Sequence, residues 1–373
     1  MRIGFHSPLP PARTGVADYS AALLRALSQG NDVQANPAQP CDIELYHTGN
    51  NQLHHGIYQR ALARPGVVVI HDAVLQHFFL GSLDEKSYVE EFVYNYGEWN
   101  RELAQRLWHG RARAAQAEEY FRYPMLRRLA EKAIAVVVHN PAAAELVKTH
   151  AGQAKVMEIP HLFEDPPAPY AADVERWRRP LGPGAFVFGV FGHLRESKRL
   201  STILRVFAEL RRKQPWVWLL VAGPMASSDL QRTAEPMLLQ PGILRVDYVP
   251  EDQFWLHAAA VDACINLKYP PAGETSGIAI RLMGIGKPVV LTAGQETARF
   301  PEASCLRVDS GLAEEEMLAA YMLWLSHNRV PARQIGKTAR QHILEHHNPS
   351  SVASQYVALL REAVPSGMLT LKP

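Results

Sequence analysis

Short runs of hydrophobic residues alternate with amphipathic, helix-like segments along the chain. In the first half, apolar runs predict strands at 2–5, 43–46, 67–70 and 133–138, and helical patterns cover about 17–27 and 85–132. Continuous short apolar runs are typical of strands in a parallel sheet that helices cover on both faces. Pro141 follows the last of these runs and is a favoured first residue of a helix. The pattern predicts a doubly wound α/β domain.

The alternation stops between residues 161 and 184, where prolines replace aliphatic residues, and then restarts. Further strands are predicted at 186–191, 216–222, 244–249, 263–267, 288–291 and 305–308, with helices over 199–213 and from Asn348 or Ser350 onward. A chain of 373 residues is too long for one ordinary core. We expect an N-terminal domain (1–165), a linker (166–184), a C-terminal domain (185–345) and a last helix (346–373) that packs back on the first domain.

The composition is that of a soluble globular protein, with 47% hydrophobic and 20% charged residues. The formal net charge is only +2, which argues against a dedicated nucleic-acid binder. The three cysteines lie far apart without metal or redox spacing, and no apolar run has the length of a signal peptide or membrane span. We expect a cytoplasmic protein without a metal or cofactor, whose contact with a membrane, if one exists, is peripheral.

The segment "FGHLRESKR", residues 191–199, lies between a predicted strand and a predicted helix. Gly192 would let a ligand approach the backbone, and Arg195 and Lys198 can reach a phosphate at the helix N-terminus. Its spacing is neither that of a Walker loop nor that of the dinucleotide glycine fingerprint. The alternative is an ordinary strand–helix turn with solvated charges.

The segment "GETSGIAIRLMGIGKPVV", residues 273–290, places a carboxylate just before another helix. Thr275, Ser276 and Gly277 precede the apolar helical pattern, so free backbone N–H groups there suit an anion or sugar hydroxyls. The ionised Glu274 only accepts hydrogen bonds, which suits hydroxyl donors. Alternatively, Glu274 interacts with the helix dipole alone.

Polar residues near the N-terminal strands are further candidates. His71 follows the run 67–70, where an imidazole could hydrogen-bond a polar substrate, while His47, His139 and His161 follow other strands as weaker candidates. Gly15 opens the first helix, either toward the same ligand or within a plain connecting loop. The arginine-rich stretch 101–132, with Trp108, Tyr120, Phe121 and Tyr123, would be a contact with a membrane surface or anionic acceptor, or a solvated helical face.

Together these segments resemble the family 4 glycosyltransferases, retaining enzymes of the GT-B fold, over nearly the whole chain. "PLPPARTGVADYSAALL" resembles the family's glycine loop and first helix, and "FGHLRESKRLSTILRVFAEL" its phosphate loop. "VAGP" and "VDYVPEDQFWLHAAAVDACINL" resemble the strands beside the nucleotide base, with Val249 near that base. "GETSGIAIRLMGIGKPVVLT" resembles the signature helix. The resemblance implies two Rossmann-like domains that face each other across a cleft.

The chain departs from the family at the second of two glutamates seven residues apart. The first meets donor sugar hydroxyls and the second meets the ribose, and counting back from Pro288 places Arg281 at the second position. Glu274 stands one residue beyond the first position. An arginine offers only donors, so the ribose contact is not carried over. Arg281 would touch phosphate or pair with Glu274, and the sequence does not choose between the two.

The resemblance implies a metal-independent retaining glycosyltransferase that uses a nucleoside-diphosphate sugar. Arg195, Lys198 and helix N-termini would stabilise the departing diphosphate, and His71 would orient hydroxyls of donor or acceptor. The acceptor would be a glycan, a lipid-linked sugar or a small molecule. The alternatives are a non-catalytic subunit that binds sugar nucleotides and another activity of the GT-B fold, such as an epimerase or a phosphorylase.

Overall fold

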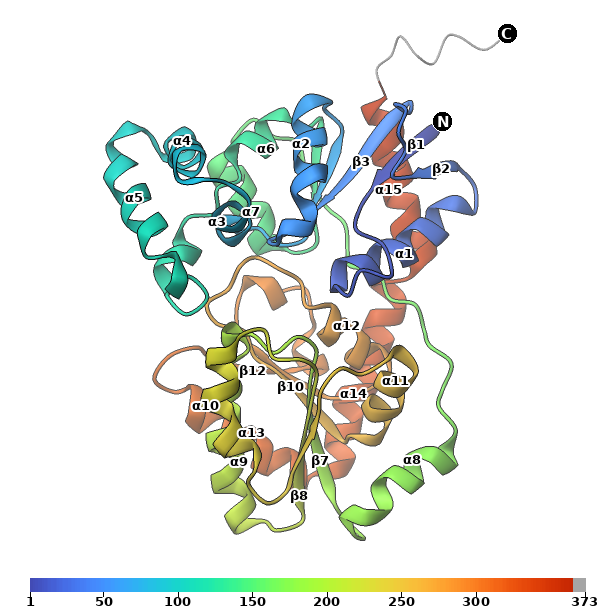
Figure 1. Ribbon diagram of the computed structural model, residues 1–373. Coiled ribbons are helices and arrows are strands. Elements are labelled where there is room, and N and C mark those ends of the chain that lie inside the picture. Colours follow the sequence, from blue (N-terminus) through green and yellow to red (C-terminus); the bar gives the residue numbers. More distant parts are fainter. Residues whose placement is uncertain (365–373) are drawn as a thin grey trace. The chain divides into compact units, whose positions relative to one another are not determined.

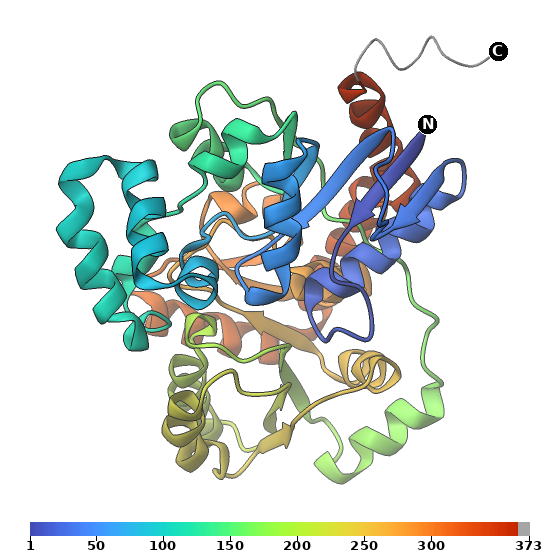
Figure 2. The same cartoon turned by 45° about the horizontal axis from the view of Figure 1, so that its top comes forward.

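The computed structural model describes residues 1–364, which form two compact units. Of these residues, unit 1 comprises 1–164, 270–277 and 346–364, and unit 2 comprises 165–269 and 278–345. Residues 270–277, expected within the C-terminal domain, therefore group with unit 1. Figures 1 and 2 show a strand-and-helix layer structure in each unit.

Unit 1 contains a six-stranded parallel sheet in the order β2-β1-β3-β4-β5-β6. Its strands are β1 (Arg2–His6), β2 (Asp32–Ala35), β3 (Ile43–Thr48), β4 (Val67–Ile70), β5 (Ala135–Val138) and β6 (Val156–Glu158). Its helices are α1 (Gly15–Ser28), α2 (His55–Ala63), α3 (Gln76–Ser82), α4 (Glu85–Tyr96), α5 (Arg101–His109), α6 (Arg127–Lys132), α7 (Pro141–His150) and α15 (Pro349–Ala363), with short 3₁₀ turns η1 (Gln52–His54), η2 (Glu98–Asn100), η3 (Arg111–Arg113) and η4 (Glu118–Arg122).

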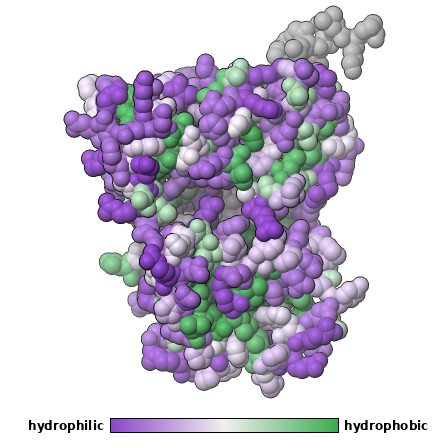
Figure 3. Space-filling view, viewed as in Figure 1, coloured by the Kyte–Doolittle hydropathy of each residue, from purple (hydrophilic) through white to green (hydrophobic). Residues whose placement is uncertain are grey.

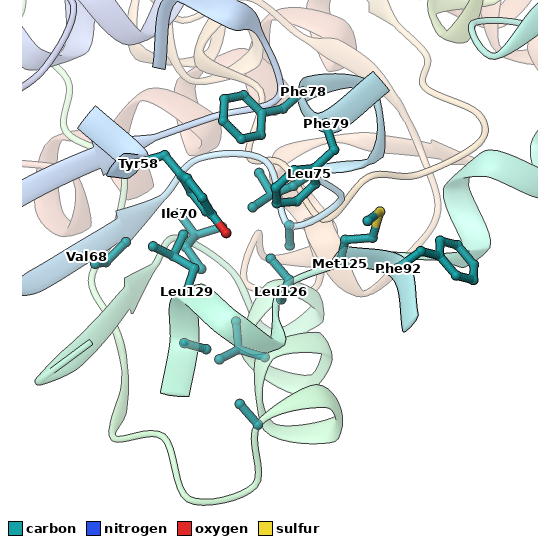
Figure 4. Packing of buried hydrophobic residues seen from close by; sticks show 14 of the residues in the cluster. Tyr58, Val68, Ile70, Leu75, Phe78, Phe79, Phe92, Met125, Leu126 and Leu129 are labelled. Atoms are coloured by element: carbon teal, nitrogen blue, oxygen red, sulfur yellow. The ribbon is translucent and has the colours of Figure 1, made fainter. Parts of the chain in front are cut away.

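Helices cover both faces of this sheet, as the continuous apolar runs predict. Successive residues of β4 alternate between two separate hydrophobic clusters, with Val68 and Ile70 in one and Val67 and Val69 in the other. The first cluster lies under α2 to α7, and Figure 4 shows Ile70 beside Tyr58 and Leu129 within it. The second lies under α1 and α15. Both faces of a strand are therefore buried, which is why the run contains no polar residue.

Unit 2 repeats this plan with the strand order β12-β11-β10-β7-β8-β9, again all parallel. Its strands are β7 (Phe186–Phe191), β8 (Val217–Ala222), β9 (Ile243–Val246), β10 (Ala263–Asn266), β11 (Val289–Thr292) and β12 (Leu306–Val308). Its helices are α8 (Ala171–Arg178), α9 (Leu200–Lys213), α10 (Ser228–Leu238), α11 (Glu251–Ala260), α12 (Gly277–Gly284, whose first residue groups with unit 1), α13 (Glu314–His327) and α14 (Arg329–His346), with turns η5 (Arg179–Leu181), η6 (Glu196–Lys198), η7 (Gln295–Thr297) and η8 (Glu302–Ser304).

Three sequence expectations need correction. The helical pattern over 85–132 is divided into α4, α5, α6 and three 3₁₀ turns, and its first break is at Gly97, which has a φ of +88°. The segment 166–184, expected to be a linker, contains α8 and η5. The edge strands β2 and β6 were not predicted, because they are short and largely exposed or half-buried and so lack a continuous apolar run.

Hydrophilic residues predominate on the face of the molecule shown in Figure 3. Within residues 1–364, no helix combines the length and the apolar character needed to cross a membrane.

Candidate functional site

Four histidines gather at the carboxyl edge of the unit 1 sheet. His47 lies near the end of β3, and His71, His139 and His161 follow β4, β5 and β6. The ring centroids of His71 and His139 are 5.1 Å apart, and those of His139 and His161 are 5.6 Å apart. The ring of Tyr19, from α1, lies 4.6 to 6.0 Å from all four. The carboxyl ends of parallel strands lie at one edge of a sheet, so the four histidines are close together in the structure. The sequence indicated each of them only as a separate candidate.

Burial keeps His47, His71 and His139 uncharged at neutral pH. Desolvation, followed by the neighbouring histidines, lowers the pKa of His47 and His71 well below the ordinary value. Burial also lowers the pKa of His139 to about 4, although a backbone hydrogen bond opposes the shift. That bond runs from His139 Nδ1 to the carbonyl oxygen of Ile159 at 2.8 Å. Because a carbonyl only accepts, His139 carries its proton on Nδ1.

Hydrogen bonds hold the loop 270–277 against the residues that follow β4 and β5. The backbone N–H of Ala73 donates to the carbonyl oxygen of Ala272 at 2.8 Å. The side-chain amide of Asn140 donates to the carbonyl oxygen of Gly273 and to Thr275 Oγ1, each at 2.9 Å. Gly273 has a φ of +66°, and an added Cβ would lie 2.7 Å from the Cβ of Ala73. The loop therefore lies directly against the residues next to His71 and His139.

Glu274 consequently belongs to the same edge of the sheet as His71, two hundred residues earlier in the chain. Its Oε2 accepts a hydrogen bond from the backbone N–H of Ala272 at 3.0 Å, which orients the half-buried carboxylate. A carboxylate that accepts hydrogen bonds and a neutral imidazole that can donate one suit the hydroxyl groups of a sugar.

Asn140 is a residue whose part in this site the sequence reasoning missed. Its Oδ1 caps α7 by accepting from the N–H of Ala143 at 2.9 Å, and the amide group remains for the loop 270–277. The available signal was an asparagine between a buried strand and Pro141, which predicts a helix cap. The cap was readable from the sequence, but the second set of hydrogen bonds was not.

The remaining glycine and serine candidates of unit 1 lie at the starts of helices. Gly15 is the first residue of α1, which Thr14 caps by accepting from the N–H of Ala17. An added Cβ at Gly15 would meet nothing within 4 Å, so space does not require glycine there. A Cβ at Gly277 would lie 3.3 Å from Nε2 of His161, which places the start of α12 beside the histidine cluster. Ser276 precedes it and is half-buried.

In unit 2, the loop after β7 contains the predicted phosphate-binding residues. Lys198 Nζ donates to the carbonyl oxygen of Phe191 at 2.7 Å, so the ammonium group folds back over Gly192. Gly192 has a φ of +92°, and an added Cβ would lie 3.1 Å from Lys198 Nζ. Gly223, at the end of β8, has a φ of +135° and leaves no room for a side chain, because a Cβ would lie 2.1 Å from the carbonyl oxygen of Gly192.

The position of this loop in the sheet favours ligand binding. The strand order of unit 2 reverses between β7 and β10, and ligands of doubly wound sheets bind beyond the strand ends at that point. Arg195 is exposed in the loop. Arg199 follows it with a φ of +56° and its Nε lies 2.9 Å from Glu314 Oε1, which fixes the end of the loop. The loop thus offers one exposed guanidinium and one anchored ammonium group.

Arg281 connects α12 to α11. Its guanidinium lies 2.8 Å from the carboxylate of Glu251 and stacks 4.2 Å from the ring centroid of Phe254 and 4.4 Å from that of Trp255. Val249 is half-buried in the loop that leads into α11, two residues before Glu251. The sequence offered phosphate or Glu274 as partners of Arg281, and the pair with Glu251 was not foreseen.

In the arginine-rich stretch 101–132, two of the aromatic residues are buried and several arginines are paired with glutamates. Trp108 and Tyr120, expected beside the arginines, are buried in the hydrophobic core. Several of the arginines form ion pairs with glutamates: Arg101 with Glu98, Arg106 with Glu119, Arg122 with Glu118 and Arg127 with Glu131. Trp99, in η2 just before α5, is 92% exposed. In the described part of the chain, no group of three or more His, Cys, Asp or Glu residues is arranged to hold a metal ion.

Comparison with known proteins supports the fold. No family model matches the chain. A Bacillus subtilis protein described as the uncharacterized glycosyltransferase YqgM is 23% identical over 199 residues, which are 52% of this chain and 54% of that protein. The matched region thus spans about half the length of this curated relative.

Solved structures match nearly the whole chain. Sucrose-phosphate synthase from Thermosynechococcus elongatus matches with a TM-score of 0.69 at 17% identity, over 97% of this chain and 98% of its own. Anabaena Alr3699/HepE in complex with UDP and glucose matches at 0.64 and 15%, over 97% and 100%. WaaG, a glycosyltransferase involved in lipopolysaccharide biosynthesis, matches at 0.62 and 13%, over 96% and 99%. With its two six-stranded parallel sheets, the chain has the GT-B fold of these glycosyltransferase structures.

Proposed function

We propose that this protein is a glycosyltransferase that transfers a sugar from a nucleoside-diphosphate sugar. The observation that carries the proposal is the convergence of His71 and Glu274 on one edge of the unit 1 sheet, through the hydrogen bonds of Ala73 and Asn140. These two side chains supply a hydrogen-bonding imidazole and a carboxylate for sugar hydroxyls. The GT-B fold, and a structural neighbour that binds UDP-glucose, agree with this type of donor.

The donor diphosphate is assigned to the loop after β7. Lys198 and Arg195 supply positive charge, and the N-terminus of α9 adds its dipole. The developing negative charge of the leaving diphosphate is stabilised by groups that are already in place, which is the main source of rate enhancement in such sites.

We further propose that the acceptor attacks the face of the sugar from which the diphosphate leaves, so that the anomeric configuration is retained. The resemblance to retaining glycosyltransferases supports this stereochemistry, and the acceptor would be a glycan, a lipid-linked sugar or a small molecule. A non-catalytic sugar-nucleotide-binding subunit with the same two sites is the alternative, and so is another GT-B activity such as an epimerase or a phosphorylase.

The first experiment is a thermal-shift screen against UDP-, GDP- and ADP-sugars. A ligand at about 100 times its dissociation constant adds ~2.7 kcal/mol to stability, which is readily measured. The best donor is then incubated with acceptors, and the released diphosphate and the anomeric configuration of the product are measured. Binding without turnover across the acceptor panel would favour the non-catalytic subunit, and absence of binding by every nucleotide-sugar would overturn the proposal.

Two variants separate the diphosphate site from the sugar site. Lys198→Ala should lower turnover by about 100-fold or more, the usual effect of losing a transition-state charge contact. Lys337→Ala, at an exposed lysine on α14, is the matched control and should leave turnover unchanged. Wild-type turnover in a double Lys198→Ala, Arg195→Ala variant would exclude the diphosphate assignment.

Glu274→Gln keeps the size of the side chain and removes its charge. It should weaken binding of the intact donor by roughly 10- to 150-fold, because a charge-assisted hydrogen bond contributes ~1.5–3 kcal/mol. Binding of the free nucleoside diphosphate, which lacks the sugar, should hardly change. Glu145→Gln, at an exposed glutamate on α7, is the control. Equal losses for donor and diphosphate, measured by titration calorimetry, would show that the carboxylate serves the nucleotide instead.

Contact with a membrane surface is a separate proposal that rests on Trp99. An exposed indole beside arginines is suited to the boundary between lipid and water. Co-sedimentation of wild type and Trp99→Ser with vesicles that contain anionic lipid tests it. Equal sedimentation of the two proteins would contradict a role of Trp99.

A further inference from the structure

A direct hydrogen bond joins two buried histidines of the cluster. His47 Nδ1 and His71 Nε2 are 3.0 Å apart, and His47 has no exposed surface. Burial keeps both imidazoles neutral, so each ring carries one proton and only one of the two facing nitrogens is protonated. Two arrangements satisfy the bond. Either His47 donates from Nδ1, or His71 donates from Nε2.

The other nitrogen of His47 distinguishes these arrangements. His47 Nε2 is buried and has no hydrogen-bond partner within residues 1–364. If His71 donated, His47 would carry its proton on Nε2 and leave an N–H group buried without an acceptor. If His47 donates, Nε2 holds only a lone pair. Buried N–H groups without partners are rarer in proteins than acceptors with unused lone pairs, so the arrangement in which His47 donates from Nδ1 is favoured.

The same reasoning fixes the proton of His71. Its Nε2 accepts from His47, and a neutral ring must then carry its proton on Nδ1. The bond to His47 is the one hydrogen bond that the His71 ring makes within the described residues, so Nδ1–H is the group that remains for a ligand. Glu274 of the same unit only accepts hydrogen bonds, so the two side chains are complementary. A sugar hydroxyl can donate to the carboxylate, and another can accept from the imidazole.

We propose that His47 is a positioning residue that holds His71 in the Nδ1–H tautomer, so that His71 donates a hydrogen bond to an oxygen atom of the sugar. The identity of the ligand rests on the proposed function, whereas the tautomer does not. His47 touches no substrate in this scheme and acts through His71 alone.

The tautomer is measured directly by nitrogen NMR of the protein labelled with ¹⁵N-histidine. Long-range correlations between ring protons and ring nitrogens distinguish a protonated from an unprotonated nitrogen, and His71→Gln identifies the signals of His71 by their loss. We expect the proton of His71 on Nδ1. A proton on Nε2 would overturn the proposal, whatever the protein binds.

Binding of UDP and UDP-glucose to variants of His47 tests the consequence. His47→Leu removes the donor and should reduce the gain in affinity of UDP-glucose over UDP by roughly tenfold, the usual weight of one neutral hydrogen bond. His47→Asn retains an N–H group at about the position of Nδ1 and should restore most of that gain. A gain in His47→Leu equal to that of wild type would refute the positioning role.

The NMR and binding results test this proposal separately from the proposed function. If wild type binds neither ligand, the assignment of a nucleotide-sugar fails while the NMR result still decides the tautomer. If His47→Leu does not fold, the Asn variant and the NMR spectrum of wild type provide the test. A His47→Asn protein that folds, but whose His71 keeps the Nδ1–H tautomer without the gain in affinity for UDP-glucose, would also count against the proposal.

Discussion

Acidification should destabilise this protein through His139, and the size of the effect follows from its surroundings. The ring is buried at the end of β5 and donates from Nδ1 to Ile159, and burial lowers its pKa to about 4. The unfolded chain has the ordinary histidine pKa of ~6.5. Below that value the unfolded state binds a proton that the folded state does not. The stabilisation is therefore complete above about pH 6.5 and is lost as the pH falls toward about 4.

The magnitude is ~1.4 kcal/mol for each pH unit between the two pKa values, or roughly 3 kcal/mol over the whole range. His139→Asn retains an N–H group near Nδ1 and removes the titrating ring. Its loss of ring packing lowers the free energy of unfolding by an amount that does not depend on pH. Between about pH 7 and pH 4, the free energy of unfolding should therefore fall by roughly 3 kcal/mol more for wild type than for the variant.

Urea unfolding of wild type and His139→Asn, followed by circular dichroism at several pH values, measures this difference. His109→Gln removes an exposed histidine at the end of α5 and is the control for loss of a histidine at the surface. Carboxylates that titrate in the same range are common to all three proteins and cancel. If the curves of wild type and His139→Asn remained parallel down to pH 4, the buried neutral state assigned to His139 would be incorrect.

Three further predictions concern unit 2 and the chemistry. Gly223→Ala forces a Cβ to within 2.1 Å of the Gly192 carbonyl oxygen and should destabilise the protein and abolish donor binding, whereas Gly15→Ala, which meets nothing within 4 Å, should be neutral in thermal unfolding. Arg281→Lys loses the stacking on two aromatic rings of α11 and should cost about 1 kcal/mol in urea unfolding; an unchanged midpoint would deny that contribution. Turnover should survive excess EDTA, and complete loss restored by Mg²⁺ or Mn²⁺ would show that a metal takes part.

Local patterns determined most of the fold. The apolar run 67–70 coincides with β4, and the run 186–191 coincides with β7, because a strand that is buried on both faces excludes polar residues. Pro141 and Asn348 mark the starts of α7 and α15, because an asparagine cap and a proline at the first position act within one turn. The resemblance to glycosyltransferases predicted the GT-B fold, which the structural matches confirm.

The candidate site residues could be nominated from the sequence, because they follow predicted strands or precede predicted helices. Their grouping required the tertiary structure. His47 and His71 form a hydrogen bond because β3 and β4 are neighbours in the sheet, and no local pattern states which strands pair. Without knowledge of that pairing, His71 is one of sixteen histidines, and its tautomer cannot be assigned because its hydrogen-bond partner is unknown.

The contacts of Glu274 and Arg281 also could not be predicted from local sequence patterns, because their partners lie far away in the chain. The loop of Glu274 groups with unit 1 because Ala73 and Asn140 hydrogen-bond to it, across separations that sequence periodicity cannot relate. Arg281 is held by Glu251 and two aromatic rings on another helix, a set of partners that depends on how α11 packs beside α12. Periodicity reports which face of an element is buried. Which side chains meet there is decided by the packing of elements far apart in sequence, because those contacts form only when the whole sheet assembles.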